Sequence, residues 1–311
     1  MNLLFCGTPD FAVPSLERII AEKCSIDLVV TNPDEPSGRG YQVKAPPVKQ
    51  AAERAGLQVF QPARLKDLAT VELLSRYRPD AIVVVAYGHI LPKWMLDLPR
   101  WGCINVHASL LPRYRGAAPI QWALIRGERA TGVTTMRLDE ALDTGDILLK
   151  REVAIQDDDT TETLRERLSQ DGADLLIETL YGLERGDLPA DAQDHTQATL
   201  APILKKEDGR IDWTLSSQEL RNRIRGLRPW PGAFTTFRGM NLHIWAATRP
   251  PVAEPSRHAP GTILVEAKRL LIACGQGTLL EATELQLEGR KRLPARDFLN
   301  GLKLSLGEKL G

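Results

Sequence analysis

The sequence predicts a doubly wound α/β domain followed by a small β-barrel domain. Three observations support this organisation. Apolar strand-like runs alternate with helix-length segments through the first half, periodicity is lost in the polar stretch 186–209, and short strands punctuated by Gly and Pro follow. The 311 residues are enough for two domains. We therefore expect domains at 1–189 and 209–311, joined by a linker at 190–208.

Each element of the first domain is expected from its periodicity. Continuous apolar runs predict strands buried on both faces, as in a largely parallel sheet covered by helices. These strands are expected at 2–7, 26–31, 57–60, 80–87, 102–107, 132–137 and 146–155. Apolar residues that recur every three or four positions predict amphipathic helices. These helices are expected at 11–22, 46–56, 64–76, 117–126 and 160–185.

The second domain begins with an amphipathic helix at 216–227, and closely spaced short strands follow it, as in small barrels. These strands are expected at 232–237, 242–247, 261–267, 269–275 and 277–289. Residues 209–311 contain 16 Lys and Arg against 9 Asp and Glu, a net charge of +7, and the rest carries −7 because the whole chain is neutral. The basic half is a candidate surface for a polyanion, and ordinary charge scatter is the alternative.

Composition argues against several classes of protein. No apolar run approaches the roughly 20 residues that cross a bilayer. The start of the chain lacks the pattern of a secretory signal. The four cysteines are widely spaced without a C-x-x-C pair, and Cys6 and Cys103 lie in apolar strands. We therefore expect a cytoplasmic protein without a disulfide framework or zinc site.

The strand at 102–107 ends with two polar side chains that project to the same face. Asn105 and His107 are two residues apart, at the carboxyl end of a strand, where α/β domains bind ligands. An amide and an imidazole there could hydrogen-bond a carbonyl oxygen that becomes an anion during acyl transfer. The alternative is a structural histidine beside an asparagine that ends the strand.

The segment LDEALDTGDILL (138–149) offers a carboxylate partner for His107. Asp143 stands in its Gly-containing turn, between Asp139 and Asp146. A carboxylate beside an imidazole can hold its tautomer and accept protons through water. The alternatives are an Asx turn and a metal site formed by the three aspartates. We expect no metal, because no His or Cys lies near them and the spacing is not that of an EF-hand.

Basic residues gather in two segments that could contact phosphates. The stretch 31–49 has no periodicity and contains Arg39 between two glycines, with Lys44 and Lys49 nearby. The helix at 216–227 and the residue after it contain Arg221, Arg223, Arg225 and Arg228. A solvated loop and a solvated helix face are the alternatives. The sequence GTPDF after the first strand is not G-x-G-x-x-G, so the dinucleotide-binding fingerprint is absent.

Several segments together resemble the methionyl-tRNA formyltransferase family. They are GTPDFAVPSL, VVVAYGHILP, CINVHASLLPRYRGAAPIQWAL, LDTGDILL, GRIDW and PWPGAF, and they span nearly the whole chain. The N-x-H, S-L-L-P and D-T-G-D elements are similar to those of the wider class that uses 10-formyltetrahydrofolate. GTPDFA, PSGRG and GRIDW are more particular to the tRNA enzyme. The resemblance implies a Rossmann-like formyltransferase domain and an OB-like barrel that binds tRNA.

The resemblance also implies roles for the residues that match the family's motifs. Catalysis is expected of Asn105, His107 and Asp143. Folate binding is expected of a turn and of the pteridine pocket, at Ser109, Leu110, Leu111, Pro112, Ile90 and Leu91. Binding of tRNA is expected of Arg39 in a loop that reaches the acceptor stem, and of Lys44, Lys205, Lys206 and Arg221.

By this resemblance, the free α-amine of initiator methionyl-tRNA attacks the formyl carbon on N10 of 10-formyltetrahydrofolate. His107 and Asn105 would stabilise the oxyanion, and Asp143 would orient His107 and help to move protons. No metal and no membrane are involved, and we expect a monomer. The alternatives are formylation of an amino sugar nucleotide, transfer of the formyl group to water, and an RNA-binding protein whose α/β half is structural.

Overall fold

The computed structural model describes residues 1–37, 42–250, 255–301 and 307–311, and the chain divides into two compact units. The first unit contains Met1–Pro119, Ala130–Ala154 and Arg165–Ala201. The second contains Ile120–Arg129, Ile155–Leu164 and Pro202–Gly311. The segment expected to be a linker, 190–208, is therefore shared between the units.

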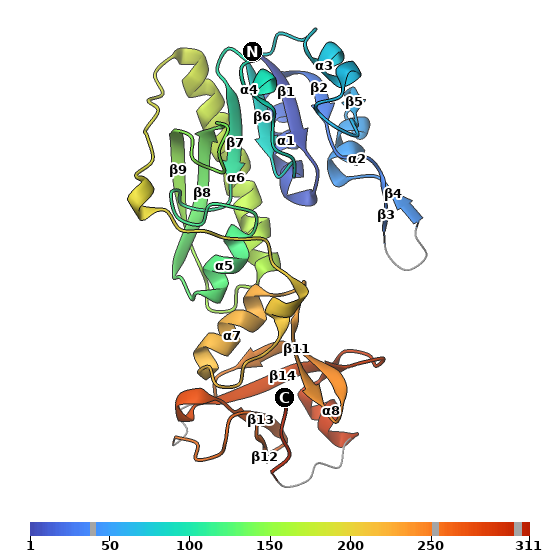
Figure 1. The fold of residues 1–311 in the computed structure, drawn as a ribbon, viewed down its shortest axis with the longest axis vertical. Coiled ribbons are helices and arrows are strands. Elements are labelled where there is room, and N and C mark those ends of the chain that lie inside the picture. Colours follow the sequence, from blue (N-terminus) through green and yellow to red (C-terminus); the bar gives the residue numbers. More distant parts are fainter. Residues whose placement is uncertain (38–41, 251–254, 302–306) are drawn as a thin grey trace. The chain divides into compact units, whose positions relative to one another are not determined.

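A seven-stranded sheet forms the first unit, in the order β5-β2-β1-β6-β7-β8-β9 (Figure 1). Its strands are β1 (Asn2–Gly7), β2 (Ser25–Val30), β5 (Val59–Phe60), β6 (Ala81–Val85), β7 (Cys103–His107), β8 (Ala130–Arg137) and β9 (Ile147–Ala154). The first five of these pair in parallel, whereas β8 pairs antiparallel with both β7 and β9. The doubly wound prediction is confirmed, and the sheet has an antiparallel edge.

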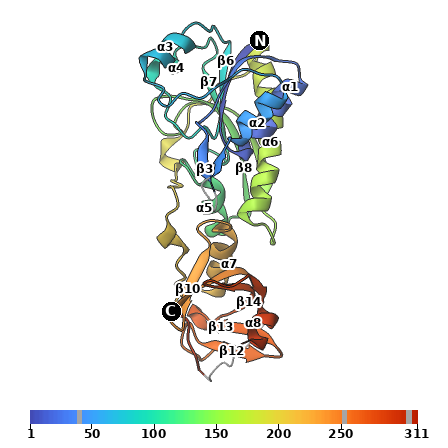
Figure 2. The same ribbon diagram turned by 90° about the vertical axis from the view of Figure 1, so that its right-hand side faces the viewer.

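Helices cover both faces of this sheet. They are η1 (Asp10–Ala12), α1 (Val13–Ala21), α2 (Pro47–Arg54), α3 (Leu68–Leu74), α4 (Lys93–Leu96) and α6 (Thr161–Arg185). Figure 2 shows α1, α2 and α6 on one side and α3 and α4 on the other. Gly172 lets α6 approach the sheet, since a Cβ there would lie 2.9 Å from Val106. On the other face, Leu74 of α3 and Met95 of α4 join a buried cluster with Cys103 of β7.

The stretch 31–49 is more regular than expected. β3 (Glu35–Ser37) and β4 (Gln42–Lys44) pair antiparallel, and α2 begins at Pro47. The expectation of an irregular loop is wrong for these residues, because strands this short do not display a periodicity. Lys49 is ion-paired with Asp34 at 2.8 Å between Nζ and Oδ2. Arg39 lies outside the described residues.

The second unit contains an antiparallel sheet in the order β10-β11-β14-β13-β12, with β15 paired to β14. The strands are β10 (Ala233–Phe237), β11 (Met240–Thr248), β12 (Ile263–Glu266), β13 (Arg269–Ala273), β14 (Leu279–Leu287) and β15 (Leu293–Pro294). The helices of this part of the chain are α5 (Pro119–Ile125), η3 (Lys206–Gly209), α7 (Ser217–Gly226), η4 (Gly275–Gly277) and α8 (Ala295–Asn300). A capping box starts α7, in which Ser216 N donates to Glu219 Oε2 at 2.8 Å.

The last residues of the chain contact both edges of this sheet. Ile263 N of β12 donates to Glu308 O at 2.8 Å, and Gly311 N donates to Thr236 O of β10 at 3.1 Å. Phe237 and Leu280 lie in the buried core that the sheet encloses. The predicted small barrel is confirmed as a barrel-like domain. No described helix in either unit is long and apolar enough to cross a bilayer.

Candidate active site

The end of β7 places Asn105 and His107 on the face of the sheet that α3 and α4 cover. Side chains alternate along a strand, and Cys103 belongs to the buried cluster on that face, whereas Val106 faces α6. The chain runs from β1 to β2 on one side and returns to β6 and β7 on the other, so the switch point of the sheet lies between β1 and β6. Sheets of this type bind ligands at the carboxyl ends of strands near that point.

A main-chain hydrogen bond fixes the orientation of the His107 ring. His107 is buried, and its Nε2 lies 2.9 Å from the carbonyl oxygen of Tyr114. A carbonyl oxygen only accepts hydrogen bonds, so Nε2 carries a hydrogen and donates it. In the neutral ring the other nitrogen, Nδ1, therefore has the lone pair. Nδ1 is the atom of His107 that can take up a proton and then donate it.

Asp143 approaches Nδ1 of His107 from the loop between β8 and β9. Its Oδ2 lies 3.7 Å from Nδ1, which is too long for a hydrogen bond, and accepts from Gly116 N at 2.8 Å. The residue is buried with a φ of 52°, in the left-handed region that Asp tolerates better than most side chains. Two residues further on, the loop passes close to the main chain at Gly145, since a Cβ there would lie 1.9 Å from Arg137 O. The carboxylate is thus held beside the imidazole with a gap between them.

Asn105 lies on the same strand as His107 and is partly exposed. Within the part of the chain that the structure describes, no hydrogen bond engages its side-chain amide, and its polar atoms are not sealed from solvent. The amide can therefore donate to a ligand without losing an existing contact. The prediction that Asn105 and His107 share one face agrees with this geometry, and Asp143 joins them from a distant loop.

The other two aspartates do not join Asp143. Asp139 is exposed and accepts hydrogen bonds from Ala141 N at 3.0 Å and Thr144 Oγ1 at 2.8 Å. Asp146 is exposed as well. Over the described ranges, no group of three His, Cys, Asp or Glu side chains is arranged to hold a metal ion. Burial raises the pKa of the nearby Cys103 thiol to about 12, so this cysteine is not a thiolate nucleophile at neutral pH.

The turn after β7 is stabilised by its own hydrogen bonds. Leu111 N donates to Thr134 Oγ1 at 3.1 Å, and Thr134 Oγ1 donates to Ser109 O at 2.6 Å. Ser109 and Leu111 are buried, so their side chains support the turn. Leu110 and Pro112 are partly exposed and are available to a ligand.

The loop between β6 and α4 supplies the other two predicted folate-binding residues. β6 lies next to β7, with Val84 opposite Asn105. Ile90 is 86% exposed, an unusual position for a large aliphatic side chain, whereas Leu91 is buried in the cluster under the loop. Ile90 can therefore contact a ligand directly, and Leu91 anchors the loop.

The predicted tRNA-binding residues differ in their surroundings. Lys44, Lys205 and Lys206 are exposed. Arg221 donates from Nη2 to the carbonyl of Asp157 within the second unit. Its neighbours are also engaged there, since Arg223, Arg225 and Arg228 contact Asp208, Gln156 and Glu162. The arginines of α7 therefore support the second unit's own structure.

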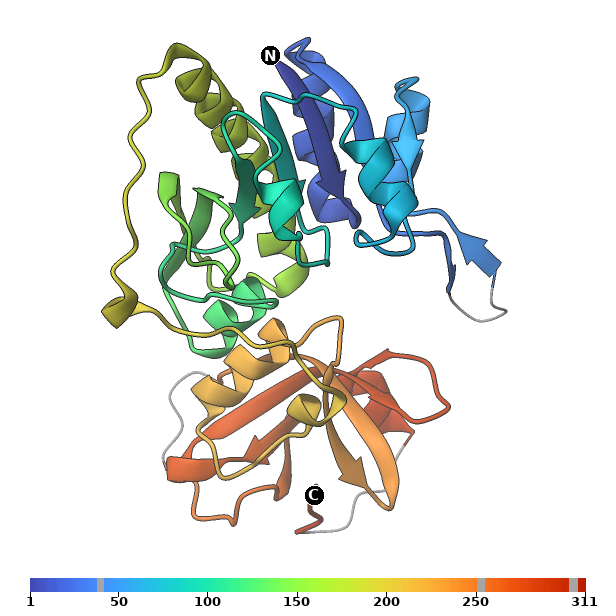
Figure 3. The ribbon, with the colours of Figure 1, turned by 45° about the horizontal axis from the view of Figure 1, so that its top comes forward.

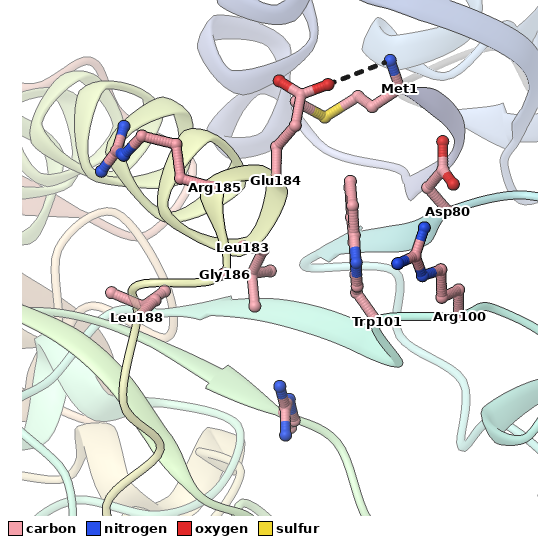
Figure 4. Close-up of a pocket in the computed structure, with 10 residues that line it drawn as sticks. Met1, Asp80, Arg100, Trp101, Leu183, Glu184, Arg185, Gly186 and Leu188 are labelled. Carbon is pink, nitrogen blue, oxygen red and sulfur yellow. Dashed lines mark ion pairs between the residues drawn. The ribbon is translucent and has the colours of Figure 1, made fainter.

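A cavity of about 640 Å³ lies at the opposite end of the strands, beside the amino ends of β1, β6 and β7 (Figure 4). It contains none of the predicted site residues. Arg100, Arg137 and Trp101 line it together with Asp80 and Glu184, so cations and carboxylates are mixed. Arg185 and Met1 also line it, and the amino group of Met1 is ion-paired with Glu184 at 3.5 Å. We assign no ligand to this cavity.

Sequence reasoning missed two residues behind the Asp143 loop. Gln193 lies in the segment expected to be a linker and donates to the main chain of Asp143. Arg115 in turn donates to Gln193. A glutamine in a polar stretch carries no local signal of such a role, because the contacts are made across more than 40 residues of sequence.

Comparisons with known proteins agree with the geometry. The Formyl transferase family matches residues 1–180, and the family described as Formyl transferase, C-terminal domain, matches residues 203–303. The methionyl-tRNA formyltransferase of Acidobacterium capsulatum is 55% identical over 313 residues, with 100% of both chains covered. The methionyl-tRNA formyltransferase of Koribacter versatilis is 54% identical over 312 residues, covering 100% of this chain and 99% of the relative.

Among solved structures, HypX from Aquifex aeolicus in complex with tetrahydrofolic acid has a TM-score of 0.66 at 18% identity. The likeness covers 99% of this chain and 48% of HypX, so the chain spans about half of that protein. At this identity it concerns the fold alone. The sequence relatives match over their full length at more than half of the positions. The chain therefore belongs to the methionyl-tRNA formyltransferase family.

Proposed function

We propose that the chain transfers the formyl group of 10-formyltetrahydrofolate to the free α-amine of initiator methionyl-tRNA, giving N-formylmethionyl-tRNA for the start of translation. The full-length relatives carry the name of this enzyme. HypX, which shares the fold, binds tetrahydrofolic acid. The observation that carries the reaction type is the approach of Asp143 Oδ2 to Nδ1 of His107, 3.7 Å apart, on the strand that also presents Asn105.

The residues beside the catalytic trio suit a folate. Ile90, Leu110 and Pro112 offer apolar surface to a pteridine ring, next to polar groups that would act on the formyl carbon. Ser109, Leu111 and Leu91 hold the surrounding backbone. The bound folate supplies an activated formyl group on N10, and we propose that these six residues hold it.

Asn105, His107 and Asp143 have distinct roles in this proposal. The Asn105 amide donates a hydrogen bond to the formyl oxygen as negative charge develops on it. His107 uses Nδ1 for proton exchange, because Nε2 is committed to Tyr114. Asp143 orients Nδ1 and accepts protons through water. An α-amine has a pKa near 8 and is partly neutral at cellular pH, so a weak base suffices.

We also propose that the tRNA contacts the barrel-containing part of the chain, 209–311, and three lysines outside that range, Lys44, Lys205 and Lys206. The net charge of +7 in 209–311 and the exposure of Lys44, Lys205 and Lys206 support this. Arg221 could contribute only with the atoms that its bond to Asp157 leaves free. Charged initiator tRNA is a cytoplasmic substrate, so we place the protein in the cytoplasm, acting as a monomer without a metal.

The substrate is tested by following a labelled formyl group. Purified protein is mixed with methionyl initiator tRNA and 10-formyltetrahydrofolate that carries the label on the formyl carbon. We expect the label on N-formylmethionyl-tRNA and little release without an acceptor. Label in formate without tRNA would indicate a hydrolase instead. Label on an amino sugar nucleotide, with none on tRNA, would indicate the other formyltransferase.

Replacing Arg39 by Ala is expected to raise the KM for methionyl-tRNA by about tenfold, because one charged contact to phosphate is lost. The Kd for folate should stay within about twofold, since the predicted folate residues lie elsewhere. Both are measured by steady-state kinetics and fluorescence titration. Arg54→Ala, at an exposed position of α2, is the control. A loss of tRNA use and folate binding in equal measure would contradict the assignment and indicate misfolding.

A further inference from the structure

The segment after α6 returns to the catalytic site instead of leading directly to the second unit. In Figure 3 it is the extended olive stretch, which includes η2 (His195–Gln197). Asp191 and Ile147 exchange two main-chain hydrogen bonds, of 2.8 and 2.9 Å. Further on, Ala201 N donates to Arg115 O at 2.7 Å. The segment is therefore bound at both ends to elements that carry the Asp143 loop and the turn after β7.

Between these two points, the buried side chain of Gln193 contacts the Asp143 loop directly. Its Nε2 donates to the carbonyl oxygens of Asp143 at 3.0 Å and Gly145 at 2.7 Å. Its Oε1 accepts from Arg115, at 3.1 Å from Nε and 2.7 Å from Nη2. A guanidinium only donates and main-chain carbonyls only accept, so the orientation of the Gln193 amide is unambiguous. Both hydrogens and both lone pairs of the amide are used.

The same segment also supports the residue that orients His107. Thr199 Oγ1 accepts from Tyr114 N at 2.9 Å, and the carbonyl of Tyr114 is the group that orients His107. Arg115 is buried and forms no ion pair within the described residues, and its Nη2 also lies 3.1 Å from Nδ1 of His195. Arg115 is thus occupied in holding this segment in place.

The contacts of Gln193 determine where the Asp143 carboxylate points. Asp143 has a left-handed backbone, and Gln193 binds the carbonyls on either side of Thr144. Among the described residues, the Asp143 side chain accepts one hydrogen bond, from Gly116 N. A displacement of the loop would therefore move the carboxylate relative to His107. Misplacement of a catalytic group by about 1 Å is enough to slow turnover severely.

We propose that Gln193 is a positioning residue for formyl transfer, which acts by holding the Asp143 loop at two carbonyls while Arg115 holds Gln193. The segment 191–201 is then part of the catalytic unit. The inference rests on the proposed function of the site.

The substitution Gln193→Glu tests the positioning role of Gln193 separately from its contribution to stability. A glutamate keeps two acceptor oxygens for Arg115 but removes both donors, and it turns a carboxylate toward two carbonyl oxygens. We expect kcat to fall by about 10- to 100-fold, while the Kd for folate stays within about twofold. Two buried hydrogen bonds are lost while Arg115 gains an ion pair, so the midpoint of thermal unfolding should fall by only a few degrees. Gln58→Glu is the matched control, since Gln58 is exposed and lies outside the segment 191–201.

The decisive measurement is the effect of Gln193→Glu in the Asp143→Asn background. If Gln193 acts through Asp143, the second substitution adds little to the first. The same fold-loss in both backgrounds, a folate Kd raised by as large a factor as kcat is lowered, or a fully active Gln193→Glu protein would each overturn the proposal. A wild-type protein that transfers no formyl group to methionyl-tRNA would instead overturn the proposed function, and the rate of the wild type in the same assay distinguishes the two.

Discussion

Replacing His107 by Ala is expected to lower kcat by about 10²-fold or more. The substitution removes Nδ1, the nitrogen that faces Asp143 and that we propose exchanges the proton. It leaves the predicted tRNA-binding residues unchanged, so the KM for tRNA should change little. Single-turnover formyl transfer with saturating folate measures the loss without interference from product release.

His258→Ala is the control for this substitution. His258 is exposed in the second unit and has no proposed part in catalysis. Circular dichroism and the thermal midpoint of each variant show whether the fold is kept. Near-normal turnover of a folded His107→Ala protein would remove the imidazole from the mechanism.

Asp143→Asn is expected to have a loss of similar size, about 10²-fold or more in kcat. The amide has the shape of the carboxylate and can still accept from Gly116 N. It has no charge, and it accepts protons poorly, so it cannot take over proton transfer beside Nδ1. The expected signature is a lowered kcat with folate binding within about twofold of the wild type.

Asp146→Asn controls for a change of charge in the same loop. Asp146 is exposed three positions further on and takes no part in the proposed reaction. It should retain turnover within about twofold, as surface substitutions generally do. If Asp143→Asn were equally active, with its fold intact, the carboxylate would have no part in proton transfer.

Local patterns were sufficient to predict the strands of the seven-stranded sheet and the position of the first two candidate catalytic residues. A continuous apolar run predicts β7, and the period of a strand places Asn105 and His107 on one face at its carboxyl end. Local patterns did not single out Asp143, because aspartates are common in loops. Its role was predicted from the family resemblance. The structure then brings its carboxylate within 3.7 Å of His107, across 36 positions of sequence.

The features that local patterns could not predict depend on long-range contacts. Gln193 is one polar residue among many in its stretch, and its buried position follows only from Arg115 and the Asp143 loop. The four residues of α4 are too few to show a helical period. The arginines of α7 and Arg228 had the pattern of a solvated or RNA-binding face, yet the structure engages them with carbonyls and a carboxylate of their own unit.

Membership of the formyltransferase family also bears on the competing functions. It excludes a protein in which the α/β half serves only as a scaffold for RNA binding, because the family match covers residues 1–180. The amino sugar nucleotide and water alternatives keep the same catalytic trio. They differ in the acceptor, which is why the labelled-formyl assay separates them.

The hydrogen bond from His107 to Tyr114 has a consequence for the chemistry of a full cycle. With one nitrogen fixed against a main-chain carbonyl, the ring cannot relay charge from one side of the protein to the other. A proton that Nδ1 takes up must leave from Nδ1 as well, toward the bound reactants. In the proposed mechanism the imidazole therefore gains and loses its proton at one nitrogen only, and each cycle ends with the ring in the tautomer in which it began.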